Sequence, residues 1–392
     1  MHTLADTALL PAGLMDVLPP FAAFEARMVE RLMAHFASFG YERVKPPLIE
    51  FEETMLAGQA AALAPATFRL MDPVAQRMLA LRPDMTMQVA RIASSRLAHW
   101  PRPLRLAYAG QVLRVRGAQV RPERQFGQVG AEIVGSDGPA ADVEVMVMAT
   151  SALAELGVAG LTVDLGLPRL VPEILAAITC DPDSEARARL ALDRKDAAAI
   201  AELAPVLGEV TADLLAVLVA STGPAEAALA TLATLELPAA AAAERASLVA
   251  VYERLHRSAP MLTITIDAVE NRGFEYHRGV TCTVFATSST DEIGRGGRYR
   301  TEKGEAATGI TLFMDAVLRA LPRPEPQRRV LLPADAPAEV AQGLRREGWV
   351  ALAALDDGIE PAHEARRLGC THVFLDGRTV PAGRERRPRS EG

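Results

Sequence analysis

The hydrophobic positions that follow Pro20 repeat with the period of a helix. Their spacings are three and four residues: Phe21, Phe24, Met28, Leu32 and Phe36. Residues at these spacings share one face of a helix, so the pattern predicts an amphipathic helix. Gly40 comes next, and a glycine just past the last periodic residue commonly ends a helix. The segment 41–51 contains Pro46-Pro47, and because prolines cannot donate to a central strand we predict an edge or interface strand there.

Short strand patterns follow from about residue 67 to residue 160. Four apolar pieces bounded by turn residues predict an antiparallel sheet: 68–71, 78–81, 104–115 and 127–134. A helix is expected around 141–156, and the sequence LTVDLG predicts a strand at 161–166. We assign these elements to the first part of a core domain, 1–167.

The composition changes at residue 168. Residues 168–258 are rich in Ala and Leu, with repeated charges and few β-branched residues, which predicts a helical insertion. The core resumes over 259–321. There LTITIDA (262–268) alternates with period two and predicts a strand, strand signals continue through about 285, and a helix is expected over about 309–321.

A proline-punctuated linker, Leu321-Pro-Arg-Pro-Glu-Pro, precedes the last domain. Strand patterns at 330–332, 350–355 and 373–375 alternate with helix patterns at 337–347 and 361–368. This alternation predicts a small α/β domain over 329–380. The last segment, 381–392, is charged and poor in apolar residues, so we expect a disordered tail.

Composition excludes several classes of protein. Only Lys45, Lys195 and Lys303 are lysines among 42 basic residues, and no Gly-Lys pair exists, which excludes a Walker-type phosphate loop. The three cysteines are far apart, which suits unpaired thiols in a reducing cytoplasm better than a disulfide framework or a metal site. A net charge of −7 argues against a dedicated nucleic-acid binder. No signal peptide or membrane span is expected from the sequence.

Four segments combine charged and amide side chains with apolar, strand-like surroundings: 81–86 (LRPDMT), 113–132, 271–276 (NRGFEY) and 294–299 (GRGGRY). Gln128 and Glu132 are four residues apart, and even spacing in a strand keeps them on one face. Arginines at 114 and 272 offer planar, permanently charged forks for a carboxylate or a phosphate. The carboxylates of Asp84 and Glu132 and the hydroxyl of Tyr276 can accept hydrogen bonds from an ammonium or an imidazole.

Such a combination suits a pocket for a zwitterionic amino acid. Each residue alone is more often a solvated or salt-bridged surface residue, and paired glycines usually form a turn. The ordered set is more specific than its members.

In this order, the segments resemble the class II core of histidyl-tRNA synthetase. The first helix with the segment from Gly40 to Pro47 resembles motif 1, the dimer interface of that family, and residues 113–135 resemble motif 2. The sequences NRGFEY and GGRY are similar to the two histidine-specific signatures. The resemblance covers about 10–320, including the insertion. It implies an α+β fold: a class II synthetase-like antiparallel sheet flanked by helices, with a helical insertion and a truncated anticodon-binding-like C-terminal domain.

The resemblance also implies a ligand-binding set. In that family, the matching residues of a histidine pocket are Asp84, Thr86, Gln128, Glu132 and Tyr276. Arg114 and Arg272 are expected to face the carboxylate or the reacting centre. His277 stands where the family usually has a second tyrosine, and Tyr299 is expected near the ligand.

The departures from the family lie on the ATP side. Arg116 replaces a glutamate of motif 2, and Ala316 replaces the motif 3 arginine that grips ATP. Arg319 is nearby in sequence, but three residues along a helix point it about 60° away. Arg300 replaces the aspartate that normally follows the second signature. The histidine side is therefore kept while the ATP side is lost, so we predict no aminoacylation.

That combination resembles the regulatory subunits of ATP phosphoribosyltransferase. The resemblance implies a non-catalytic cytoplasmic protein without cofactor or metal. It implies a homodimer within a hetero-octamer with short-form ATP phosphoribosyltransferase catalytic subunits, L-histidine as inhibitory effector, and neither nucleic acid nor membrane as partner. Two alternatives remain open at this point. An active histidyl-tRNA synthetase-like ligase would show histidine-dependent pyrophosphate exchange, and an interaction protein without ligand would not bind histidine.

Overall fold

The computed structural model describes residues 9–117, 122–270, 277–356 and 360–383. It divides into two compact units, Met1–Pro322 and Arg323–Gly392, and the boundary in the sequence falls within the proline-punctuated segment. The residues expected to bind a ligand all belong to the first unit. Within the described ranges, no helix is long and apolar enough to cross a membrane.

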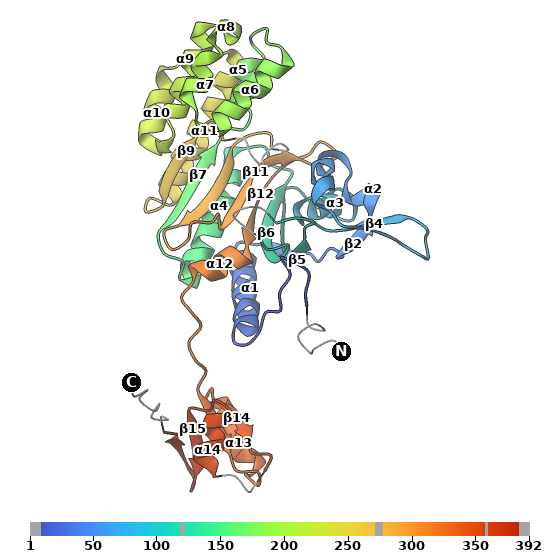
Figure 1. The fold of residues 1–392 in the computed structure, drawn as a ribbon, viewed down its shortest axis with the longest axis vertical. Coiled ribbons are helices and arrows are strands. Elements are labelled where there is room, and N and C mark those ends of the chain that lie inside the picture. The colour runs from blue at the N-terminus through green and yellow to red at the C-terminus, as the bar shows by residue number, and fades with distance from the viewer. Residues whose placement is uncertain (1–8, 118–121, 271–276, 357–359, 384–392) are drawn as a thin grey trace. The chain divides into compact units, whose positions relative to one another are not determined.

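A nine-stranded sheet forms the centre of the first unit (Figure 1). Neighbouring strands run antiparallel except in the pairs β1/β5 and β7/β9, so the sheet is mixed at its ends and antiparallel in its middle. In spatial order the strands are β1 (Glu42–Arg43), β5 (Leu104–Leu113), β6 (Gln125–Val134), β12 (Ala306–Phe313), β11 (Gly294–Arg300), β10 (Thr281–Ala286), β7 (Leu161–Gly166), β9 (Thr263–Asp267) and β8 (Gly223–Pro224).

The first helix, α1 (Phe21–Ser38), confirms the periodic pattern and packs beside α4 (Pro139–Leu156) against the sheet. Its buried face includes Leu32 and Phe36. The helix ends as expected at Gly40, whose φ is +85°. The amide of Gly40 donates to the carbonyl of Ala37, and that of Tyr41 donates to that of Phe36, a pair of bonds that closes a helix with a left-handed residue.

The segment 41–51 serves two sheets. Its first part is β1, at the edge of the large sheet as predicted. Its last part is β2 (Ile49–Phe51), in a three-stranded antiparallel sheet with β4 (Met78–Leu81) and β3 (Arg69–Met71). Pro46-Pro47 lies between them and has no amide hydrogen to continue either ladder. The expectation that 68–81 and 104–134 share one sheet was therefore wrong, because β3 and β4 belong to the small sheet.

Three helices alternate with the strands of the small sheet along the chain: α2 (Glu52–Met55) and the 3-10 helix η2 (Gly58–Ala66) follow β2, and α3 (Thr86–Ser95) follows β4.

Helices account for most of the segment expected to be a helical insertion, and Figure 1 shows them gathered beyond β7 and β9. They are α5 (Leu170–Leu175), α6 (Pro182–Asp193), α7 (Ala197–Glu202), α8 (Ala204–Leu207), α9 (Glu209–Ala220), α10 (Ala225–Thr234) and α11 (Ala239–Ser258). The Nζ of Lys195 lies 2.5 Å from Oδ1 of Asp267, a buried residue at the end of β9. This ion pair joins the insertion to the sheet.

The segment expected to be a helix over about 309–321 is only partly helical. Residues up to Phe313 complete β12, and α12 (Met314–Ala320) begins afterwards. The run Gly-Ile-Thr-Leu-Phe is rich in β-branched and aromatic residues, and its strand is buried on both faces between β6 and β11. Burial on both faces removes the period-two alternation that would have marked a strand.

The second unit contains a four-stranded sheet in the order β14 (Val350–Ala353), β13 (Arg329–Leu332), β15 (His372–Leu375) and β16 (Arg378–Pro381). The helices α13 (Ala338–Arg346) and α14 (Pro361–Arg367) alternate with the parallel strands, as the pattern predicts. The strand β16 was not predicted. It pairs antiparallel with β15 across Asp376-Gly377, both of which have positive φ.

Candidate functional site

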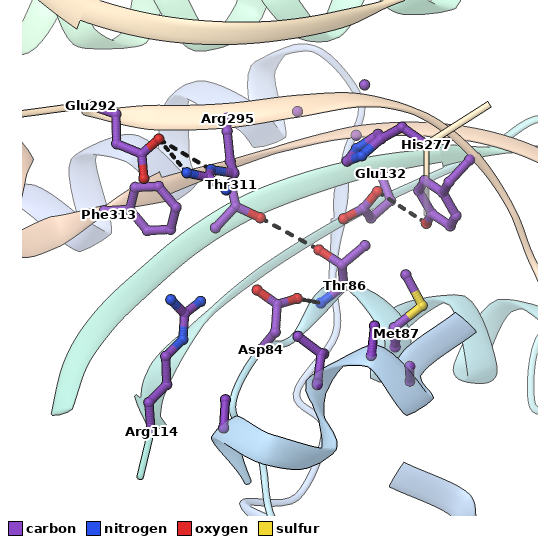
Figure 2. Close-up of a pocket in the computed structure, with 18 of the residues that line it drawn as sticks. Asp84, Thr86, Met87, Arg114, Glu132, His277, Glu292, Arg295, Thr311 and Phe313 are labelled. Atoms are coloured by element: carbon purple, nitrogen blue, oxygen red, sulfur yellow. Dashed lines mark hydrogen bonds and ion pairs between the residues drawn. The ribbon is translucent and has the colours of Figure 1, made fainter. Parts of the chain in front are cut away.

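A pocket of about 370 Å³ opens above the middle of the large sheet (Figure 2). Strands β6, β12 and β11 form its floor, and the 3-10 helix η2 and the start of α3 form its wall. Most of the residues expected to bind a ligand line this pocket: Asp84, Thr86, Arg114, Glu132, His277 and Tyr299. Arg272 and Tyr276 lie outside the described residues.

Strand register puts the floor residues in rows. In the first row, Gly309 lies between Glu132 and Gly297. Two residues further along the strands, Thr311 lies between Gly130 and Arg295. Because alternate residues of a strand share a face, the side chains in these rows project to the same side of the sheet. A Cβ atom on Gly309 would overlap the Glu132 carboxylate, so only glycine fits there. Gln128 and Glu132 both lie on β6, and their even spacing puts their side chains on one face of the strand, as predicted.

Glu132 is the most enclosed acid of the pocket, with 1% of its surface exposed. The hydroxyl of Tyr108 donates to Oε1 at 3.1 Å, and that of Tyr299 donates to Oε2 at 3.1 Å. Burial raises the pKa of Glu132 to about 8, and the nearby Asp84 charge adds to the rise, while the tyrosine hydrogen bonds oppose it. At neutral pH the empty pocket therefore holds this carboxyl mainly in its protonated form.

Two hydrogen bonds hold Asp84 in a fixed orientation, and a third holds the residue that donates one of them. The backbone amide of Thr86 donates to Oδ1 at 2.8 Å, and Nε2 of Gln128 donates to Oδ2 at 2.8 Å. The backbone amide of Met85 in turn donates to Oε1 of Gln128 at 3.1 Å. Gln128 is fully buried and is not among the residues that line the pocket, so it positions Asp84 from behind.

Hydroxyl groups join the two acids. Oγ1 of Thr86 lies 3.1 Å from the hydroxyl of Tyr108, which lies 2.8 Å from Oγ1 of Thr311. A closed network of this kind fixes side-chain orientations before any ligand arrives. It presents two carboxyl groups and several hydroxyl oxygens to the same volume, which suits a ligand with more than one N–H donor.

The other end of the pocket is basic. Nε of Arg114 donates to the carbonyl of Pro83 at 3.2 Å, and its guanidinium lies 5.1 Å from the ring centre of Phe126. Arg295 donates to Oε2 of Glu292 from both Nε and Nη2, at 3.2 and 2.5 Å. Asp84 and Glu132 on one side and an excess of arginines over the single acid Glu292 on the other suit the charge distribution of a zwitterion.

His277 lies at the same end as Glu132, as Figure 2 shows, and only 4% of its surface is exposed. Gly297 lets it approach, because a Cβ atom there would come within 2.8 Å of its ring. The position at which the synthetases usually have a second tyrosine thus carries a buried imidazole that lines the pocket.

Side chains fill the space around Ala316. This residue is fully buried in a cluster with Phe126 and Phe313, whose rings meet edge to face with centres 6.0 Å apart. Arg319 is not among the residues that line the pocket. Its guanidinium instead forms ion pairs with three acids at distances of 3.0 to 3.1 Å: Glu123, Asp291 and Asp315.

Sequence reasoning missed four lining or bridging residues: Tyr108, Glu292, Arg295 and Thr311. The sequence did contain a signal for Arg295. It shares one face of β11 with Gly297 and Tyr299, and both of these residues belong to the second signature. Tyr108 and Thr311 lie in apolar strand runs, and only the pairing of β5, β6 and β12 brings them to the acids.

Comparison with known proteins agrees with this architecture. Residues 13–317 match the family model of histidyl-tRNA synthetase. Among solved structures, an ATP phosphoribosyltransferase regulatory subunit/histidyl-tRNA synthetase from Bacillus halodurans has the same fold, with a TM-score of 0.81 and 24% identity over 94% of this chain and 97% of that one. The fold and the pocket thus define a protein built on the histidyl-tRNA synthetase core.

More similar sequences narrow the class. The ATP phosphoribosyltransferase regulatory subunit of Paramagnetospirillum magneticum is 55% identical over 368 residues, which cover 94% of this chain and 96% of that protein. The protein of the same name from Rhodospirillum centenum is 53% identical over 372 residues, 95% of each chain. This chain belongs to the family of ATP phosphoribosyltransferase regulatory subunits, and it is a non-catalytic subunit.

A chain of the ATP phosphoribosyltransferase complex from Thermotoga maritima shares the fold at a TM-score of 0.58. It is 20% identical, and the match covers 74% of this chain and 97% of that one.

Proposed function

We propose that this chain is the histidine sensor of an ATP phosphoribosyltransferase, and that it assembles with the short catalytic subunit in the cytoplasm and lowers its activity when histidine fills the pocket. The observation that carries the proposal is the contrast within one pocket. Its acidic end is a complete, buried hydrogen-bond network around Glu132 and Asp84. Ala316, at the position where the synthetases have an ATP-gripping arginine, is fully buried in an apolar cluster that includes Phe126 and Phe313.

Histidine suits both ends of this pocket. Its ammonium and imidazole carry the N–H donors that Asp84 and Glu132 accept, and its carboxylate is the anion that arginines such as Arg114 hold. A buried carboxyl with a pKa of about 8 gains a strong partner when a cationic group arrives, because an opposite charge favours its ionised form. Arg272, Tyr276, His277 and Tyr299 complete the proposed ligand set.

The proposal excludes catalysis by the same pocket. Adenylation of an amino acid needs ATP held beside the carboxylate, and loss of one preorganised charge contact typically costs about 10²–10³ in rate. Ala316 has no donor, and the ion pairs of Arg319 with Glu123, Asp291 and Asp315 engage it elsewhere. We therefore expect no histidine-dependent pyrophosphate exchange from the purified chain.

Self-association is part of the proposal. Large apolar side chains are exposed on the motif 1 segment and on the small sheet next to it: Leu48, Ile49, Leu70, Met71, Val74 and Met78. Exposed apolar side chains gathered on neighbouring elements favour an interface. We assign this surface to a homodimer, which in turn belongs to a hetero-octamer with the catalytic chains.

Regulation then needs only a modest coupling between sites. Histidine must bind a less active state of the complex more tightly than the active state, and a difference of about 1–3 kcal/mol gives 5- to 150-fold inhibition. The preorganised network around Asp84 and Glu132 gives histidine a rigid binding site. Binding at this site would stabilise the less active state of the complex.

The test is reconstitution with a short catalytic subunit from the same organism. We expect co-purification, phosphoribosyl transfer to ATP that depends on this chain, and inhibition by histidine. Asp84→Ala should keep the activation and weaken the inhibition at least tenfold, because the variant loses a charged hydrogen-bond acceptor. Asp213→Asn, which changes an exposed acid on α9, is the control and should behave like the wild type.

Two results would remove the proposal. One is a complex whose activity does not respond to histidine at any concentration. The other is histidine-dependent pyrophosphate exchange by the isolated chain, which would make it an active synthetase.

A further inference from the structure

A groove of about 500 Å³ lies between α4, α11 and Phe39 at the end of α1. The helix α4 shares a hydrophobic core with Val129, Ala131 and Ile133 of β6. These residues alternate along the strand with Glu132, which lines the pocket, so they face the other side of the sheet. The groove therefore lies among the helices that cover the face of the large sheet opposite to the pocket.

One side of α4 forms the floor of this groove. Ala140, Val143, Glu144 and Val147 line it, and their spacings of three and four residues put them on the same side of the helix. The other sides of α4 contact α1, α11 and β12. A helix that is apolar on nearly every side is typically covered all round by other elements. The groove thus leaves an apolar strip of α4 available to a partner.

The rim of the groove carries positive charge. Arg254 and Arg257 of α11 line it and are exposed, and neither forms an ion pair within the described part of the chain. Nε of Arg257 donates only to the carbonyl of Glu253, in its own helix, at 3.2 Å. Glu144 is the one acid among the lining residues, and Arg105 already donates to both of its carboxylate oxygens, at 2.7 and 2.8 Å. The charge of the two arginines is therefore not balanced within the groove.

We propose that this groove is the surface on which the catalytic subunit docks, through an acidic amphipathic helix. The inference rests on the proposed function, which supplies the partner. Apolar side chains of that helix contact the strip on α4, and its carboxylates pair with Arg254 and Arg257. A groove between two packed helices suits a third helix, because side-chain ridges of one helix fit the grooves of its neighbours. The pocket on the opposite face stays open to a ligand while the partner is bound.

Charge favours a different chain over a second copy of this one as the occupant. A two-fold contact brings the same surface of each copy together. Here it would place Arg254 and Arg257 of one chain near the same arginines of the other. Like charges that face each other across an interface are unfavourable, whereas an acidic partner complements them.

The experiment titrates the full-length chain with the short catalytic subunit of the same organism in a calorimeter, at low and at high salt. Arg254→Glu reverses one charge on the rim, and it should weaken binding by about tenfold or more at low salt, because it replaces an attraction to the acidic partner with a repulsion. The difference between this variant and the wild type should shrink at high salt, since mobile ions screen charges on an exposed rim.

Two further variants keep the test decisive. Ala140→Glu places an acid in the groove at an exposed position in the first turn of α4, where a negative charge is favourable for the helix, and it should weaken binding in the same way. Arg187→Glu is the matched control, because it makes the same change of charge at an exposed arginine of α6 and should bind like the wild type. All three variants should bind histidine as the wild type does, since none of these residues lines the pocket.

The outcomes separate this inference from the proposed function. A wild-type chain that does not bind the catalytic subunit contradicts both. Wild-type binding that neither Arg254→Glu nor Ala140→Glu weakens contradicts the inference alone, and so does an equal loss in Arg187→Glu, which would point to overall charge. Variants that change the sedimentation of the isolated chain but not its binding to the catalytic subunit would assign the groove to a second copy, and they too would overturn the inference.

Discussion

Replacing Glu132 with glutamine should stabilise the ligand-free protein in neutral and mildly alkaline solution. Burial raises the pKa of Glu132 to about 8 in the folded chain, from an ordinary value of 4.5. Between these two values the folded state binds more protons than the unfolded state, so stability falls as the pH rises. The contribution of this carboxyl is therefore fully present below pH 4.5 and is lost progressively as the pH rises to about 8.

The size of the effect follows from the shift. One pKa unit corresponds to about 1.4 kcal/mol, so a rise from 4.5 to about 8 costs the folded state up to about 5 kcal/mol above pH 8. Glutamine has the same shape as the protonated acid, and its carbonyl oxygen accepts a hydrogen bond from Tyr108 or Tyr299. The variant therefore lacks the titrating group while it fills the same space.

The measurement is the free energy of unfolding in urea, at pH values from 5 to 9, without histidine. The two proteins should be nearly equally stable at pH 5, and the variant should gain about 1.4 kcal/mol over the wild type for each pH unit up to 8. Glu202→Gln, which removes an exposed carboxylate from α7, is the matched control and should follow the wild type.

Parallel pH profiles for the wild type and Glu132→Gln would refute the reasoning, because they would mean that Glu132 titrates alike in the folded and unfolded chains. A gap that widens toward acid would reverse the sign and show a carboxylate stabilised by its tyrosine neighbours.

Three other substitutions test separate parts of the structure. Gly309→Ala places a methyl group in the space of the Glu132 carboxylate, so calorimetry should show at least a tenfold loss of histidine affinity; Gly343→Ala, where the methyl meets nothing, is the control. Phe313→Ala should lower the free energy of unfolding by about 3–5 kcal/mol, because it leaves a cavity in the core, and a loss under about 1 kcal/mol would mean that the site collapses easily. Met71→Asp should shift the sedimentation of the isolated chain from dimer to monomer, and an unchanged dimer would place the interface elsewhere.

Local sequence patterns predicted those helices and strands whose hydrophobic period matches the side of the element that is buried. The helix α1 has a regular apolar face and a terminal glycine, so period and capping give the same answer. β12 was misread in part because a strand buried on both faces shows no alternation. β16 could have been found, because Asp-Gly between two strand-like runs is a strong hairpin signal, and the turn at Asp376-Gly377 has the two positive φ values that it requires.

The division of strands between two sheets depends on long-range pairing. The alternation within 68–81 does not indicate which strand this segment pairs with. The chain passes from the large sheet to the small one at Pro46-Pro47, which lies further upstream.

The pocket-lining residues were predictable where a motif carried them. Asp84, Glu132 and Tyr299 belong to segments that resemble a known pocket, and the structure places them around one volume. Gln128, which was expected in the ligand set, donates to Asp84 and is not among the residues that line the pocket. Arg295 was missed because a single arginine in a strand looks like a surface residue until strand register places it in the pocket.

The strands that carry Glu132 and Gly309 come from opposite sides of the helical insertion, yet they pair directly. Contacts between segments so distant in sequence form slowly, because the intervening chain must be closed into a loop first. We therefore expect the pocket to be absent from partly folded chains and to appear only when both halves of the sheet have joined. Under the proposed function, a newly made subunit would therefore not respond to histidine until its synthesis and folding are complete.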